Sequence, residues 1–142
     1  MGKSFITPMK KLELVDNERC FACGLENPDG LRLIWQVEGN VMTTAFSALP
    51  KYQGWQGIVH GGILATLLDE AMTRLAWIVC GGALTAEMTV RYVAPAPIGE
   101  TFQVRGEIVQ ESRKLVEMKA LIHDASGTLI AHSTGKAIKV CL

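Results

Sequence analysis

The chain has 142 residues, of which 49% are hydrophobic, and its 14 basic and 14 acidic side chains give a formal net charge of zero. No basic run or stripe breaks this balance, so the composition argues against a protein that binds nucleic acid or a membrane surface. A chain of this length typically forms one domain with a core of ordinary size.

The N-terminal part of the chain contains a CxxC pair. Residues 1–19 are mixed in composition, and we expect an arm or a short helix there, ahead of a single domain over residues 20–142. Zinc would need two more ligands near Cys20 and Cys23, and no second CxxC or HxxxH is present. A thioredoxin-like motif would need a helix where turn residues follow. We therefore expect reduced structural thiols, no metal site and, because the N-terminus lacks an apolar signal segment, a cytoplasmic protein.

Two strands joined by a tight turn are predicted next. Residues 31–37 and 41–47 are rich in strand-forming side chains, and Gly39 with Asn40 between them favours a hairpin.

The longest predicted element is a helix over residues 62–80. Its apolar side chains recur at helical spacing around most of its circumference, so we expect it to be buried on nearly all sides. Gly81 favours a left-handed cap at its end. A membrane span is disfavoured because Asp69 and Arg74 lie within the helix, where each charge would cost about 2.5–3.5 kcal/mol at a bilayer centre.

Two adjacent carboxylates on this helix need an explanation. Arg74 follows Glu70 by four residues, which is the spacing of a helical ion pair. Asp69 has no cation at three or four residues, and an unpaired carboxylate is costly to bury. We expect Asp69 to face a cavity, a subunit boundary or a ligand, while a loop-capping role or a pair with a distant Lys or Arg is an equally open alternative.

Four long strands are predicted after the helix, with turn residues between them. They span residues 83–95, 100–112, 114–124 and 128–140. Hairpin links imply antiparallel pairing. The order of the elements therefore predicts an α+β domain, in which an antiparallel sheet of about six strands wraps one long central helix.

The most specific motif surrounds a histidine at the start of the helix. The pattern GxxHGGxxxxxxDE is formed by Gly57, His60, Gly61, Gly62, Asp69 and Glu70. It resembles the helix motif of the PaaI-like acyl-CoA thioesterases, a family with the hotdog fold. The segments LTAEMTVRYVAPAPIGE and CFACGLENPDGLRL are also similar to parts of that family. The resemblance covers roughly residues 20–138.

This resemblance implies an acyl-CoA thioesterase, which hydrolyses an acyl- or aryl-CoA to the free acid and CoA without a further cofactor. Unpaired N–H groups at a helix start suit a developing oxyanion. We expect the Gly61 N–H to polarise the thioester carbonyl and His60 to orient it. Asp69 would act as general base or nucleophile, and Thr85 would hold the attacking water beside it.

Five further residues are candidates for substrate binding. Gly62 would let the substrate approach the helix start closely. Related enzymes often carry Asn six residues before the histidine, where this chain has Gly54, and Gln56 is the nearest amide. Arg113 and Lys114, at a hairpin tip, are candidates for the CoA phosphates, although charges at such tips are more often plain surface.

The spacing of the motif also bears on assembly. Gly61 and Asp69 are eight residues apart, about 12 Å along one helix, which is too far to serve a single carbonyl. In the family that the chain resembles, the glycine and the carboxylate of one site come from different subunits, which implies a homodimer or a dimer of dimers. The alternatives are a non-catalytic acyl-CoA sensor and, less favoured because its histidine is not followed by this pattern, a hydroxyacyl dehydratase.

Overall fold

The computed structural model describes residues 14–140. One α-helix, one short 3₁₀-helix and six strands follow each other in the order β1 (Gln36–Glu38), β2 (Val41–Ser47), η1 (Pro50–Tyr52), α1 (Gly61–Cys80), β3 (Ala83–Tyr92), β4 (Thr101–Glu111), β5 (Leu115–Asp124) and β6 (Leu129–Lys139). All strand pairs are antiparallel, and the sheet order is β1-β2-β4-β5-β6-β3. The predicted architecture of a single helix and six antiparallel strands is confirmed.

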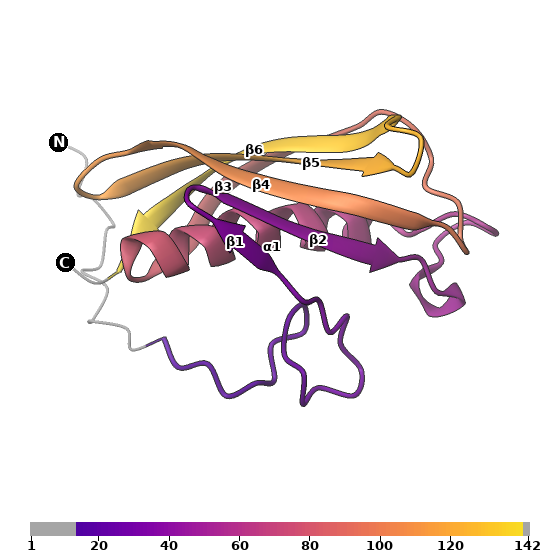
Figure 1. Ribbon diagram of the computed structural model, residues 1–142, viewed down its shortest axis with the longest axis horizontal. Helices are drawn as coiled ribbons and strands as arrows, with labels where there is room; N and C mark the ends of the chain where they lie inside the picture. The colour runs from indigo at the N-terminus through magenta and orange to yellow at the C-terminus, as the bar shows by residue number, and fades with distance from the viewer. Residues whose placement is uncertain (1–13, 141–142) are drawn as a thin grey trace, which may run out of the picture.

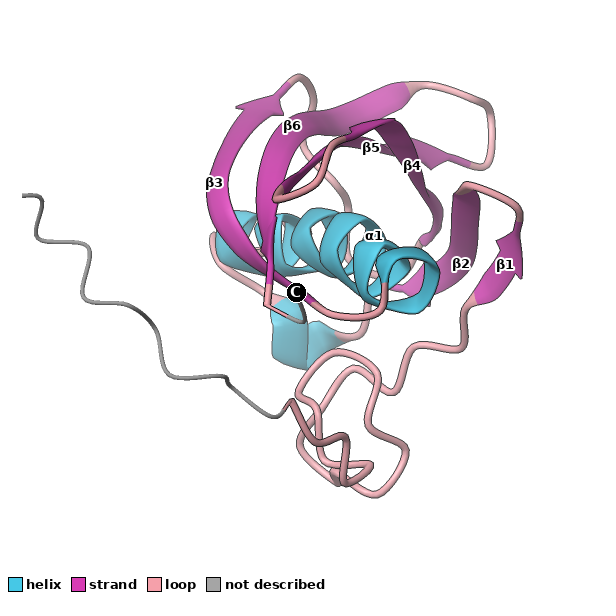
Figure 2. Cartoon of the chain, turned by 90° about the vertical axis from the view of Figure 1, so that its left-hand side faces the viewer, coloured by secondary structure: helices cyan, strands magenta, loops and turns pink. Residues whose placement is uncertain are grey.

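The sheet curves around α1 and leaves one side of the helix free (Figure 2). In β4, Phe102, Val104 and Ile108 alternate with exposed residues and are buried, because successive side chains of a strand point to opposite faces. The helix contributes a continuous buried stripe to the same core. Its buried residues are Leu64, Leu67, Leu68, Ala71, Met72, Leu75 and Ala76.

A glycine in β4 brings the sheet unusually close to the helix. A Cβ added to Gly106 would lie 2.1 Å from the carbonyl oxygen of Ala71, so no larger residue fits without displacing backbone. This contact sets the distance between the middle of the sheet and the middle of α1.

The helix α1 ends at the predicted signal, Gly81, and begins one residue before the predicted start. The Nδ1 atom of His60 accepts a hydrogen bond from the Gly62 N–H (2.8 Å), which makes His60 the N-cap. Gly81 closes the helix at φ +81°, a left-handed conformation that glycine adopts without strain, and its N–H donates to the carbonyl of Trp77. None of the helices in the described part of the chain has the length and apolar character that crossing a membrane requires.

The prediction that α1 is buried on nearly all sides is wrong for one face. Ile78 and Val79 are 45% and 40% exposed, and Asp69 is only half-buried. The sheet covers a single side of the helix, and the segment before β1 runs along the opposite side and covers it only in part (Figure 1).

The first predicted strand is mostly loop. Only Gln36–Glu38 pairs with β2, because the backbone N–H groups of Leu31 and Leu33 donate to the carbonyls of Phe21 and Ala22 instead. Residues 14–19 form no helix, and the rest of the predicted arm, residues 1–13, lies outside the described residues.

Candidate active site

Two threonine hydroxyls hold the Asp69 carboxylate. The Oδ1 atom of Asp69 accepts hydrogen bonds from Thr85 Oγ1 (2.6 Å) in β3 and from Thr73 Oγ1 (3.0 Å), one turn further along α1. The two hydroxyls also contact each other. The predicted proximity of Asp69 and Thr85 is confirmed. Thr73 was missed, although its spacing of four residues from Asp69 was a signal for such a contact.

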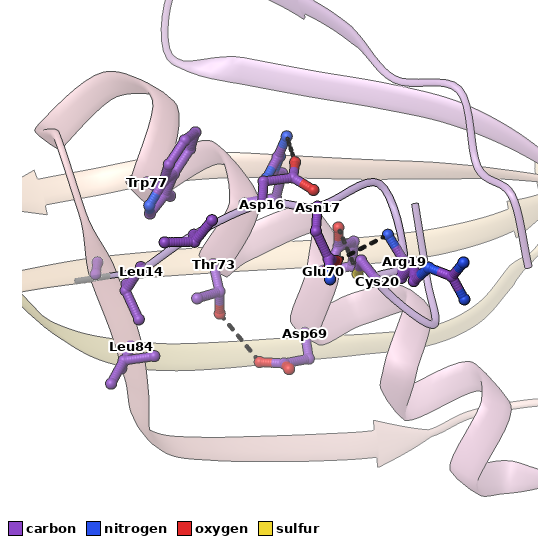
Figure 3. Close-up of a pocket in the computed structure, with 13 residues that line it drawn as sticks. Leu14, Asp16, Asn17, Arg19, Cys20, Asp69, Glu70, Thr73, Trp77 and Leu84 are labelled. Atoms are coloured by element: carbon purple, nitrogen blue, oxygen red, sulfur yellow. Dashed lines mark hydrogen bonds and ion pairs between the residues drawn. The ribbon is translucent and has the colours of Figure 1, made fainter. Parts of the chain in front are cut away.

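Asp69 lies in the wall of a cavity of about 520 Å³. Apolar side chains supply much of the lining, among them Leu14, Val15, Trp77 and Leu84. The residues come from α1, from the start of β3 and from the N-terminal segment 14–20, which passes in front of the helix (Figure 3). A carboxylate with one ordered oxygen therefore faces a space lined by apolar groups.

The start of α1 forms a second polar centre. His60 is exposed, and its Nδ1 acts as an acceptor for Gly62, so the proton of the neutral ring is on Nε2. Within residues 14–140 the Gly61 N–H donates to no protein acceptor. Tyr92 in β3 donates its hydroxyl proton to the Gly61 carbonyl (2.9 Å) and fixes this turn against the sheet. The Gly61 N–H is thus free for a ligand, whereas the Gly62 N–H donates to the His60 side chain that caps the helix.

Gly54 lies directly beside His60. A Cβ at position 54 would be 3.1 Å from the Cα and 3.3 Å from the Cδ2 of His60, so a larger residue there would press on the ring. The side chain of Gln56 is exposed, and it is Gln53 whose amide oxygen accepts the Gly57 N–H (2.8 Å). The structure therefore brings Gly54 and His60 together, whereas the Gln56 side chain makes no hydrogen bond within residues 14–140.

Arg113 and Lys114 are located far from the helix start within one chain. They form the turn between β4 and β5, where the Lys114 carbonyl accepts the N–H of Lys139 at the end of β6. The neighbouring Val140 N–H donates to the Gly82 carbonyl just after α1. This turn is thus at the Cys80 end of the helix, opposite to Gly61.

The single chain does not assemble its two polar centres at one point. Gly61 is the first residue of α1 and Asp69 lies eight residues further along the same uninterrupted helix, about 12 Å away. No carbonyl group can touch both.

The predicted ion pair between Glu70 and Arg74 is wrong. Arg74 pairs with Asp16 of the N-terminal segment (Nη2 to Oδ2, 2.9 Å) and stacks over the ring of Trp77. The backbone N–H of Glu18 and the Arg74 guanidinium lower the pKa of Asp16. The helical spacing was compatible with the predicted pair, but a carboxylate from a distant segment takes its place.

Glu70 instead faces the CxxC loop. Its Oε1 lies 4.0 Å from the Sγ of Cys20. Burial raises the pKa of Glu70, and burial together with the Glu70 carboxylate raises the pKa of Cys23.

Curated proteins similar to this chain are named as acyl-coenzyme A thioesterases. The chain is 31% identical over 101 residues to the acyl-coenzyme A thioesterase THEM4 of Xenopus laevis, an alignment that covers 70% of this chain and 46% of that protein. The chain spans about half the length of the curated relatives it matches.

Solved structures share the fold. A crystal structure of a thioesterase superfamily protein matches 86% of this chain and 61% of its own with a TM-score of 0.78 at 23% identity. The PaaI phenylacetic acid degradation protein of Thermus thermophilus, solved in a mutant form, matches 77% of this chain and 94% of its own with a TM-score of 0.71 at 24% identity. The protein smu.793 of Streptococcus mutans, solved bound to acetyl CoA, matches 75% and 87% with a TM-score of 0.70 at 20% identity. The predicted hotdog fold is confirmed.

Residues 56–131, which include the histidine, the glycine pair, Asp69 and the strands that follow, match the thioesterase superfamily. With this match over more than half of its 142 residues, and with the fold and the motif in agreement, the chain belongs to the thioesterase superfamily.

Proposed function

We propose that the chain is an acyl-CoA thioesterase, which hydrolyses an acyl- or aryl-CoA to the acid and CoA. The observation that carries this proposal is the Asp69 carboxylate, held by two hydroxyls in the wall of a cavity with apolar lining. A site that only bound an acyl chain would gain nothing from a carboxylate there. The relatives named as acyl-coenzyme A thioesterases and the Streptococcus mutans protein bound to acetyl CoA support the same substrate class.

In the proposed reaction Asp69 acts on the thioester carbonyl through water or directly. As a general base it removes a proton from a water molecule while the water oxygen attacks the carbonyl carbon. As a nucleophile its oxygen forms an anhydride that water then cleaves. In both routes the carbon–sulfur bond breaks, the CoA thiolate leaves and takes up a proton, and the acyl group ends as a carboxylate.

The oxyanion formed during the attack needs a donor. The free Gly61 N–H at the positive end of α1 meets this requirement, and a donor of this kind typically contributes about 2.7–4 kcal/mol. His60 would donate from Nε2 to orient the carbonyl, with Gly54 leaving room beside its ring. Thr85, whose hydroxyl already contacts Oδ1 of Asp69, would hold the attacking water within reach of the other oxygen, Oδ2.

A complete site would require two chains. Because Gly61 and Asp69 of one chain cannot reach one carbonyl, we infer a homodimer, or a dimer of dimers, in which each site takes Gly61 from one subunit and Asp69 from the other. The edge strand β3 carries Leu84 and Tyr92 at 36% and 53% exposure, and Val93 directly after it is 53% exposed, so this edge is a suitable surface for the contact. Arg113 and Lys114, in the turn at the Cys80 end of α1, remain candidates for the CoA phosphates.

The proposal is tested with Asp69→Asn. The substitution keeps the shape of the side chain but removes the base, so kcat should fall by about 10²–10⁴-fold or more, while the Kd of the substrate changes little. Thiol release from a panel of acyl- and aryl-CoA thioesters gives kcat, and calorimetry with the inactive variant gives Kd. Asp124→Asn, at the last residue of β5, is the matched control and should keep the wild-type rate. Substrate binding without any wild-type turnover would favour the acyl-CoA sensor instead.

A further inference from the structure

The CxxC loop has the backbone geometry of a tight turn that directs two thiols to one side. The Cys23 N–H points to the Sγ of Cys20 (3.5 Å), and the Gly24 N–H donates to the Cys20 carbonyl (2.9 Å). A Cβ at position 24 would lie 2.4 Å from the Cys20 nitrogen, so this turn requires glycine. An N–H directed at a sulfur stabilises the thiolate form, which is the form that binds metals.

A third donor reaches this pair from the helix. One oxygen of Glu70 and the sulfur atoms of Cys20 and Cys23 all lie within 4.8 Å of one another, and the three residues are half-buried (Figure 3 shows Cys20 beside Glu70). The nearest candidate cation, Arg74, is engaged by Asp16. The two thiols are weak hydrogen-bond donors to the partly buried Glu70 carboxylate, and a cation among the three groups would stabilise it more strongly.

These separations are close to those of a zinc site. Tetrahedral zinc binds sulfur at about 2.3 Å and carboxylate oxygen at about 2.0–2.2 Å, so two of its ligand atoms lie roughly 3.5–3.8 Å apart. The 4.0 Å between Cys20 Sγ and Glu70 Oε1 needs only a small side-chain adjustment to reach that value. Two cysteines separated by two residues are the usual half of a structural zinc site, and soft thiolates select zinc over the harder divalent ions.

We propose that Cys20, Cys23 and Glu70 bind a Zn²⁺ ion that fastens the N-terminal loop to α1, with a water molecule as the fourth ligand. The site differs from the expectation of no metal because its third ligand is on a helix fifty residues away from the cysteines. Cys20 and Glu70 also line the cavity in front of Asp69. The ion would therefore hold one wall of that cavity in place without touching the reacting atoms.

The test is a titration of the reduced, metal-free protein with Co²⁺ and then Zn²⁺. We expect one Co²⁺ per chain, an intense sulfur-to-cobalt charge-transfer band in the near ultraviolet, and displacement of cobalt by zinc. Cys20→Ser and Cys23→Ser should weaken the band strongly. Glu70→Gln should lower the affinity by at least the roughly 10–100-fold that changes around metal ligands typically cause. Cys80→Ser is the matched control, because this half-buried thiol is at the far end of α1 from the CxxC loop and should leave the titration unchanged.

Three results would overturn the proposal. The first is a wild-type titration without a charge-transfer band when thiol counting confirms that the cysteines are reduced. The second is a Cys20–Cys23 disulfide that forms in the purified protein even when zinc is present in excess. The third is equal loss of the band in the Cys80→Ser control. The wild-type titration decides the question even if the cysteine variants fail to fold, and none of these readouts depends on thioesterase activity.

Discussion

At the scale of single residues, the proposed chemistry centres on one oxygen of Asp69. Thr73 and Thr85 both donate to Oδ1, and no donor among residues 14–140 contacts Oδ2, which could therefore act on a water molecule or a carbonyl carbon. A carboxylate anchored through one oxygen keeps its direction, and orientation of this kind is a large part of what a catalytic base contributes.

The hydrogen bond from Thr85 to Oδ1 predicts how activity responds to substitution of this threonine. Thr85→Val removes a 2.6 Å hydrogen bond to a charged group, which is typically worth about 1.5–3 kcal/mol, so kcat should fall by about ten- to a hundredfold with little change in KM. Thr85→Ser keeps the hydroxyl and should recover most of the rate. If Thr85→Ser were as slow as Thr85→Val, the hydroxyl would not be the relevant group.

The sequence indicated Asp69 as a candidate but could not describe its surroundings. The motif and the missing helical cation both pointed to this residue. The pairing of Glu70 with Arg74 was predicted wrongly because spacing along a helix reports only local neighbours, and Asp16 reaches Arg74 from 58 positions earlier in the chain. The approach of Cys20 to Glu70 escaped the sequence analysis for the same reason.

At the scale of elements, close contact between α1 and β4 determines how the sheet wraps the helix. Gly106→Ala would place a methyl group 2.1 Å from the Ala71 carbonyl oxygen, and overpacking of this kind costs about 1–3 kcal/mol or more. We expect a clear drop in Tm. Arg105→Ala, an exposed neighbour on the same strand, is the control and should change stability by at most about 0.5 kcal/mol. Equal Tm values for the two variants would show that the helix can move away at no cost.

The N-terminal segment is fastened to α1 partly through the Asp16–Arg74 pair, and this contact should depend on pH. The folded pKa of Asp16 is lowered below its usual 3.8, so the pair contributes stability above that value and loses it as the pH falls through the folded pKa. An ion pair with this exposure is worth about 0.2–1 kcal/mol. The Tm difference between wild type and Asp16→Asn should therefore be present at neutral pH and vanish once the pH falls below the lowered, folded pKa of Asp16. A difference that is constant with pH would exclude the ion pair as its cause.

Most elements could be predicted because their patterns are local. The end of the helix follows from Gly81, and the four long strands follow from alternation and turn residues, whereas the His60 cap became evident only in the structure. The prediction of the first strand was mostly wrong because Leu31 and Leu33, although typical strand residues, form backbone hydrogen bonds with the CxxC loop. The exposed face of α1 could not be predicted either. The apolar pattern of a helix does not tell whether a sheet of the same chain or another surface covers its apolar residues.

At the scale of the whole molecule, the proposed enzyme depends on contributions from two subunits. A mixed dimer of two differently inactivated chains separates this arrangement from a site within one chain. One chain carries Asp69→Asn. The other carries Gly61→Pro, which removes the N–H at the first helical position, where proline is well tolerated, and the extended conformation of His60 suits a following proline.

The decisive measurement is the thioesterase rate of this mixed dimer, purified through a different tag on each chain. If each site takes Gly61 from one subunit and Asp69 from the other, one of the two sites combines an intact Gly61 with an intact Asp69. The mixed dimer should then show about half of the wild-type rate, while each parent dimer stays inactive. A mixed dimer that is as inactive as its parents, beside an active wild type, would contradict the shared site.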